Sequence, residues 1–153
     1  MRVAQGPRPW TIHAFAVLFT AHGLVALIRA LGSLELSELT LQAQYPAIDW
    51  HRDWVIVWHS AWFSIVLIPV VAVWLFASRL ARILVTLMAL ATLPALYRFS
   101  VLLAGDYPAP WQAQAWLGLL QNAAAVMAVA LLFLGASSRW LRQERAHFDK
   151  VFG

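Results

Sequence analysis

The chain has 153 residues, of which 62% are hydrophobic and only 12% are charged, and its mean hydropathy is +0.70. This composition excludes an ordinary soluble domain and indicates a membrane protein. The formal net charge of the chain is +4, but this does not by itself indicate nucleic-acid binding, because the basic residues gather at the ends of apolar segments. The absence of cysteine excludes disulfides, thiolate metal sites and cysteine nucleophiles.

Four apolar stretches are long enough to cross a bilayer, at residues 10–31, 53–77, 82–103 and 111–135. The second contains about twenty successive residues without a formal charge, which at 1.5 Å per residue matches a hydrocarbon core of about 30 Å. The first is too long for the apolar region of a signal peptide and contains His13, His22 and Arg29, so we interpret it as a retained helix. We therefore predict an all-α integral membrane protein, a single domain over 1–153, with four transmembrane helices in an up-down bundle.

The connections and prolines refine this prediction. Residues 32–52 interleave leucines with polar side chains, which indicates an interfacial segment, either a short helix or an extended piece.

Pro69 and Pro94 lie inside the second and third spans, where each removes a backbone donor, so both helices are expected to bend. Thr92 is the nearest polar side chain that can satisfy a freed backbone group in the third span.

The loop charges predict the orientation. The amino terminus, the second loop and the carboxyl-terminal tail contain eight basic residues: Arg2, Arg8, Arg79, Arg82, Arg139, Arg142, Arg145 and Lys150. The first and third loops contain five acidic residues and the single Arg52: Glu35, Glu38, Asp49, Asp53 and Asp106. Cytoplasmic loops are enriched in Lys and Arg, so both termini are predicted to be cytoplasmic. Because ten of the eleven basic residues are arginine, which points to a GC-rich genome, we expect a multi-pass protein of a bacterial inner membrane.

Two further patterns predict packing surfaces. Trp54, Trp58 and Trp62 are four residues apart and form a ridge on the second helix. Contact with lipid or another subunit explains this ridge better than a stacking wall for a flat cofactor. Small residues also share one side of the first and fourth helices, namely Ala16, Thr20, Gly23 and Ala30, and Ala115, Gly118, Asn122 and Ala125. Such residues let helix backbones approach closely in a membrane.

Polar side chains recur at a similar depth in all four spans. His22, His59, Arg98, Gln121 and Asn122 fall about 8 to 15 Å below the outer surface at 1.5 Å per residue. One further polar residue, Arg29, follows His22 by seven positions and therefore lies on the same helix face, closer to the surface. Polar groups at membrane depth tend to face the bundle interior, so we expect a polar pocket open toward the outer side.

Each of these residues also has a purely structural interpretation. A membrane histidine commonly hydrogen-bonds a serine, a backbone carbonyl or an amide, and Gln121 and Asn122 can simply tie helices together. Arg98 can extend to lipid phosphates. No carboxylate lies deep in a span, so Arg98 otherwise requires a bound anion, a lipid headgroup or the acid group of a ligand.

The function classes differ in what they require. A b-type haem needs His22 and His59 to face each other, and a hydrolase or coupled transporter needs an acidic partner that the spans do not contain. The tryptophan ridge, the small-residue seams and the short loops favour a non-catalytic accessory or assembly subunit of a larger membrane complex, or a homo-oligomer. The alternative is a membrane bundle that binds a ligand or cofactor, such as haem b or an anionic lipid, in its outer half through His22, His59, Arg98, Arg29, Gln121 and Asn122. No catalytic residue or metal ligand set is assigned.

Overall fold

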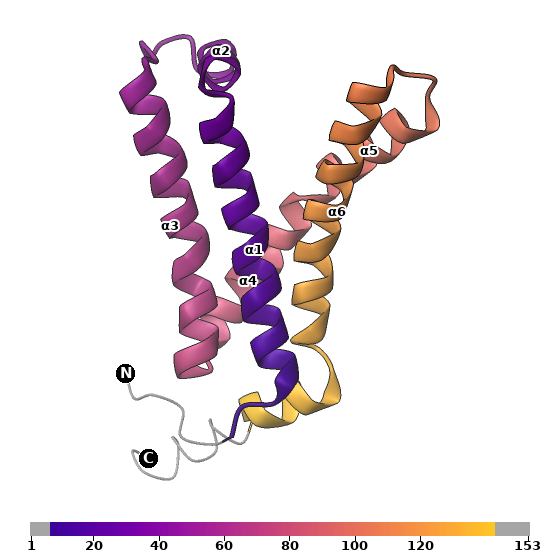
Figure 1. Cartoon of the computed structure of the whole chain (residues 1–153). Coiled ribbons are helices and arrows are strands. Elements are labelled where there is room, and N and C mark those ends of the chain that lie inside the picture. Colours follow the sequence, from indigo (N-terminus) through magenta and orange to yellow (C-terminus); the bar gives the residue numbers. More distant parts are fainter. Residues whose placement is uncertain (1–6, 143–153) are drawn as a thin grey trace.

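The computed structural model describes residues 7–142, and all regular elements in this range are helices (Figure 1). The helices are α1 (Trp10–Gly32), α2 (Leu34–Gln44), α3 (Arg52–Phe76), α4 (Arg79–Ala91), α5 (Leu93–Ala104) and α6 (Ala109–Leu131), with a short further helix over 135–142. Four segments are long and apolar enough to cross a membrane: α1, α3, α4 together with α5, and α6. The predicted all-helical class with four candidate spans is therefore confirmed. Arg2, Arg145 and Lys150, used above for the orientation, lie outside the described residues.

The third span is interrupted where its proline predicted a bend. α4 ends at Ala91 and α5 begins at Leu93, with Pro94 in the first turn of α5. Pro94 has no N–H to donate and disfavours helical backbone at the preceding residue. Thr92 stabilises the break, because its backbone N–H and its hydroxyl both donate to the carbonyl of Ala89, at 3.1 and 2.7 Å. α3 instead continues through Pro69 as one helix, and the bend expected there stays a prediction.

Two connections contain helices. The segment 32–52 forms α2 directly after α1, so the helical alternative is correct. The fourth span ends at Leu131 rather than at the predicted residue 135, and a turn leads into the 135–142 helix. This helix packs back onto the bundle: Leu141 is fully buried, and the hydroxyls of Thr11 and Ser137 are 2.6 Å apart. The segment after the fourth span thus contains a helix, which was not predicted from the sequence and which tertiary contacts stabilise.

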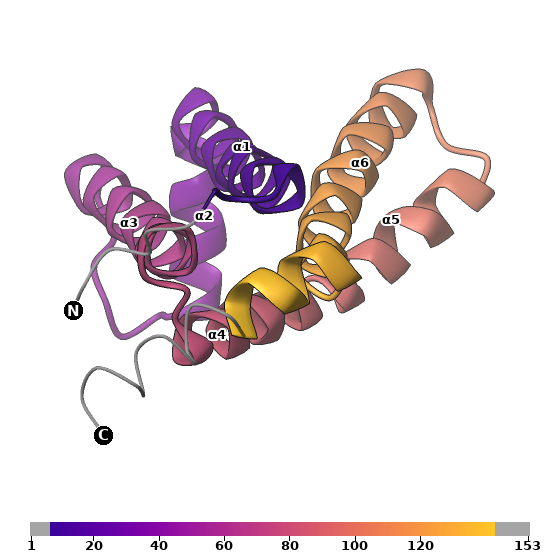
Figure 2. The ribbon, with the colours of Figure 1, turned by 90° about the horizontal axis from the view of Figure 1, so that it is seen from below.

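α1 lies between α3 and α6, and α5 packs against α6. α4 passes behind α1 in the view of Figure 1 and leads from α3 to α5 (Figures 1 and 2). α5 and the adjoining half of α6 lean away from α1 and α3 (Figure 1). We call the end of the molecule that holds the start of α1 and the 135–142 helix the core end, and the opposite end the α2 end. The hydrophobic core lies at the core end, with Ile12, Phe15, Phe19, Val73, Val85, Ala128 and Leu132. α5 contributes no buried residue.

Two members of the predicted small-residue seams lie at close helix contacts. Gly23 of α1 is buried against α3, and a Cβ added there would be 3.2 Å from side-chain atoms of Phe63 and Val66. Gly118 of α6 is buried against α5, and an added Cβ would overlap the ring of Phe99. The two glycines therefore allow the close approach of α1 to α3 and of α5 to α6.

Candidate functional site

A polar network joins α1 to α6 near the α2 end. Nδ1 of His22 is 2.9 Å from the carbonyl oxygen of Gln121, and because a carbonyl only accepts, Nδ1 donates. The amide nitrogen of Gln121 donates in return to the carbonyl of His22, at 3.3 Å. Arg29 donates to Oε1 of Gln121 at 3.2 Å and to Oε1 of Gln114 at 2.9 Å. The structure thus brings together three of the predicted residues, His22, Arg29 and Gln121.

This network corresponds to the structural interpretation of these residues. The Gln121 amide has a partner for its nitrogen and for its oxygen, and Arg29 is held at both terminal nitrogens. The sequence analysis missed Gln114, although it precedes Gln121 by seven residues and therefore lies on the same helix face. Asn122 donates to the carbonyl of Gly118 in its own helix, at 2.7 Å.

Replacing Gln121 by leucine is expected to loosen α1 from α6. The variant loses the acceptor of Arg29 and the donor to the His22 carbonyl, and interhelical hydrogen bonds in membranes contribute about 1–2 kcal/mol. We expect a decrease of that size in the free energy of unfolding, measured by denaturant titration in mild detergent. Gln112→Leu is the matched control, because no described group hydrogen-bonds the Gln112 side chain. Equal stability of both variants would show that the network does not hold α1 against α6.

His59 lies in a different place. It lines a cavity of about 480 Å³ between α2 and α3, together with Ser33, Leu36, Ser37, Thr40, Leu41, Gln44, Tyr45, Trp58 and Trp62. Its Nε2 is buried and has no hydrogen-bond partner among the described residues. The rings of Trp58 and Trp62 are stacked, with centroids 6.4 Å apart and planes 9° apart. Part of the predicted tryptophan ridge therefore forms an aromatic wall of this cavity.

The common interior space expected for the polar layer is not formed. His22 bonds to α6, whereas His59 lines the cavity with α2, so the two imidazoles face different neighbours. This geometry does not fit a haem held between His22 and His59. The prediction that both histidines converge is wrong because α1 directs His22 toward α6, whereas α3 directs His59 toward α2.

Arg98 is on the surface of α5. Its side chain is exposed, and it has no hydrogen bond or ion pair with any described residue. It lies in the candidate span Arg79–Ala104, six residues before the end of α5, which corresponds to about 9 Å along the helix axis. Arg98 is thus a cation on the outer face of an apolar helix and does not share a space with His22 or His59.

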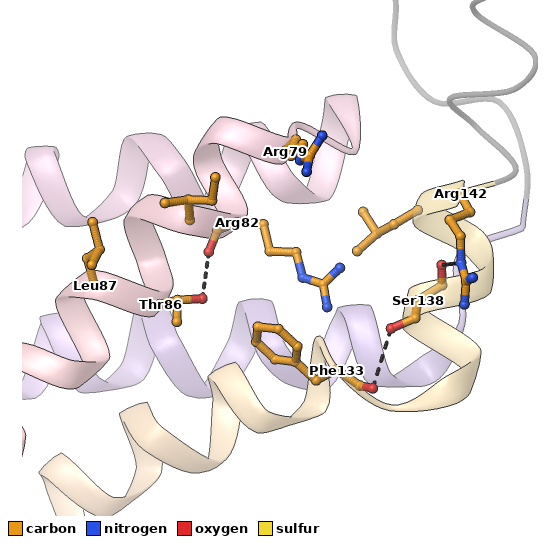
Figure 3. Close-up of a pocket in the computed structure, with 9 residues that line it drawn as sticks. Arg79, Arg82, Thr86, Leu87, Phe133, Ser138 and Arg142 are labelled. Carbon is orange, nitrogen blue, oxygen red and sulfur yellow. Dashed lines mark hydrogen bonds between the residues drawn. The ribbon is translucent and has the colours of Figure 1, made fainter.

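A second cavity, of about 530 Å³, lies at the core end between α4 and the 135–142 helix (Figure 3). Its lining combines three arginines, two hydroxyl groups and four apolar side chains: Arg79, Arg82 and Arg142; Thr86 and Ser138; and Ile83, Leu87, Phe133 and Leu141. We refer to it as the basic cavity. In the sequence, these arginines indicated only the orientation of the chain. The three-residue spacing of Arg79 and Arg82 places them on neighbouring parts of one helix surface, but nothing in the sequence indicated that Arg142 would lie across from them.

Within residues 7–142, no group of three or more histidine and acidic side chains is arranged to hold a metal ion. Comparisons with protein-family models, with curated proteins and with solved structures gave no match.

Proposed function

We propose that this chain is a non-catalytic accessory subunit that binds a larger membrane protein through the outer face of α5. The observation that carries the proposal is Arg98, an exposed cation in a candidate span without a partner among the described residues. A charged side chain in hydrocarbon is costly, and such residues normally pair with one another or face a polar space.

The packing of α5 also supports its outer face as the binding surface. α5 has no buried residue and packs against α6, so most of its surface is free to contact a neighbour. Tyr97 and Val101 flank Arg98 and are 71% and 49% exposed. The partner surface that complements this face is an apolar helix with an aspartate or glutamate at the depth of Arg98. A carboxylate can accept hydrogen bonds from two nitrogens of one guanidinium group. Co-purification of the native chain and of an Arg98→Leu variant with other membrane proteins tests this proposal.

The proposal also includes the orientation of the chain in the membrane. Positive charge at the core end supports an up-down bundle with both termini in the cytoplasm of a bacterial cell, as a multi-pass inner-membrane protein. Arg79, Arg82, Arg139 and Arg142 lie at or near this end, whereas the described acidic residues belong to α2, to the start of α3 and to the loops after α2 and α5. The contact between Thr11 and Ser137 holds the beginning of α1 and the 135–142 helix together at one end.

Cysteine labelling tests the orientation. We expect cysteines at Ala47 and Ala109, both exposed near the α2 end, to react in intact cells with a membrane-impermeant thiol reagent. A cysteine at Arg139, exposed in the 135–142 helix, is expected to react only after the cells are opened. Ser137 is unsuitable because it is fully buried and would be protected on either side. Labelling at position 139 but not at 47 and 109 in intact cells would reverse the orientation.

A second candidate function, ligand binding, is favoured by the cavity between α2 and α3. A buried imidazole nitrogen without a partner is costly and is well suited to a bound polar group. The stacked Trp58 and Trp62 offer an apolar wall, so the fitting ligand is a small amphipathic molecule with one flat apolar part. The proposed test is mass spectrometry of small molecules extracted from the purified protein. A compound present in the native protein and missing from His59→Leu would support this function, and identical extracts would contradict it.

A further inference from the structure

The basic cavity is lined by several cationic side chains. It is lined by Arg79, Arg82 and Arg142, and none of the other described lining residues carries a carboxylate. The acidic residues that the structure describes all belong to segments at the α2 end. Arg79 and Arg142, which lie at the edges of this space, place positive charge there and favour the binding of an anion.

Local contacts orient two of these arginines. The guanidinium carbon of Arg82 lies 4.1 Å from the centre of the Phe133 ring, a cation–π contact between α4 and the segment after α6. Nε of Arg142 donates to the carbonyl of Ser138 at 3.3 Å. Figure 3 shows the Arg82 guanidinium between α4 and Phe133, with Arg79 and Arg142 at the edges of the same space. Side chains held in this way lose less entropy when they bind an anion.

The cavity is also amphipathic. Arg79 is the first residue of the third span, and Ile83 and Leu87 follow it at four-residue intervals on the same ridge of α4. Leu87 is thus about 12 Å deeper along the helix than Arg79. Ile83, Leu87 and Phe133 are 49%, 56% and 55% exposed, so the apolar part of the cavity opens to the surrounding hydrocarbon. A ligand that fits both parts has a negative headgroup and an acyl chain.

We propose that the basic cavity binds the phosphate group of an anionic phospholipid, with one acyl chain along Ile83 and Leu87. Arginine is suited to this role because its planar fork donates two hydrogen bonds to phosphate oxygens. Basic pockets between transmembrane helices on the cytoplasmic side are a recurrent arrangement for acidic headgroups. The lipid would link α4 to the 135–142 helix, and the Arg82–Phe133 contact already joins α4 to the turn just before that helix.

Native mass spectrometry of the full chain in mild detergent tests this inference, with phosphatidylglycerol as the probe and phosphatidylcholine of the same acyl chains as the comparison. We expect stronger retention of phosphatidylglycerol. We expect Arg79→Gln with Arg142→Gln to weaken its binding about thirtyfold, since each basic side chain beside an anionic lipid contributes about fivefold. Arg79→Lys with Arg142→Lys should recover part of this loss, because the charges remain without the bidentate fork.

Arg139→Gln is the matched control, because Arg139 is exposed in the 135–142 helix but does not line the cavity. An equal loss in this variant would attribute binding to net charge and overturn the proposal. Equal retention of phosphatidylcholine would also overturn it. Millimolar inorganic phosphate added to the lipid-bound protein separates the two sources of phosphate: retention of the lipid supports a lipid site, and its displacement identifies a soluble anion site instead. Circular dichroism of each variant verifies that the helices are intact.

Discussion

Substitution of Arg98 by leucine is expected to separate the chain from its membrane partner while leaving the chain itself folded. Removing one member of a buried, hydrogen-bonded charge pair at an interface costs about 2–5 kcal/mol, which corresponds to a decrease in affinity of about thirtyfold or more. The partner should therefore disappear from affinity purifications of the tagged variant. The free energy of unfolding of the isolated chain should change by less than about 0.5 kcal/mol, because Arg98 is exposed and bonds to no described residue.

Two control variants make this prediction specific. Arg98→Lys keeps the positive charge without the fork and should retain part of the partner. Tyr97→Leu changes the adjacent side chain, which is 71% exposed, and should retain most of it. If Arg98→Leu keeps the partner as fully as the native chain does, the side chain extends to lipid phosphates instead, and the accessory-subunit proposal loses its main support.

Substitution of Gly118 by valine is expected to separate α5 from α6. An added Cβ at this position overlaps the ring of Phe99, and valine adds two further methyl groups. Overpacking of this kind typically costs about 1–3 kcal/mol. The cost should appear as a lower unfolding temperature in detergent and as faster proteolysis in the loop between α5 and α6. The effect should be large because α5 packs mainly on α6 and has no buried residue of its own.

A compensating substitution and a control test the stated cause. Phe99→Leu in the Gly118→Val background removes part of the ring and should restore much of the lost stability, because the two residues are in direct contact. Gly32→Val should have a small effect, since an added Cβ at Gly32 meets nothing within 4 Å. The stated cause would be contradicted if Gly118→Val with Phe99→Leu and Gly32→Val were both destabilised. Valine would then disfavour these helices for a reason other than the contact with Phe99.

Much of the architecture followed from the sequence alone, because the bilayer imposes a simple requirement. A segment crossing hydrocarbon must be apolar and must satisfy its own backbone hydrogen bonds, so four apolar stretches of about twenty residues predict four helices. The break near Pro94 was predictable for a similar local reason, since proline lacks the donor that a continuous helix needs. The close contacts at Gly23 and Gly118 followed from the periodicity of small residues.

The site depended on information that periodicity does not contain. Depth along each helix placed His22, His59 and Arg98 in one layer, but the direction in which each side chain points depends on how the helices are rotated and ordered. In the structure α1 separates α3 from α6, so His22 meets Gln121 whereas His59 faces α2, and Arg98 lies on the outer surface of α5.

The basic cavity shows the same division between sequence and tertiary structure. The sequence by itself determined that Arg79 lies in the loop before the third span, that Arg82 opens this span and that Arg142 follows the last one, because charges are excluded from hydrocarbon and collect at its borders. Only the tertiary structure decided that the residues after α6 form a helix that turns back and places Arg142 opposite α4. That helix is stabilised by burial of Leu141 and by the contact of Ser137 with Thr11, which is 126 residues away in the chain. Contacts over such separations leave no periodic pattern in the sequence, so the three arginines could be placed at one end of the bundle but not around one cavity.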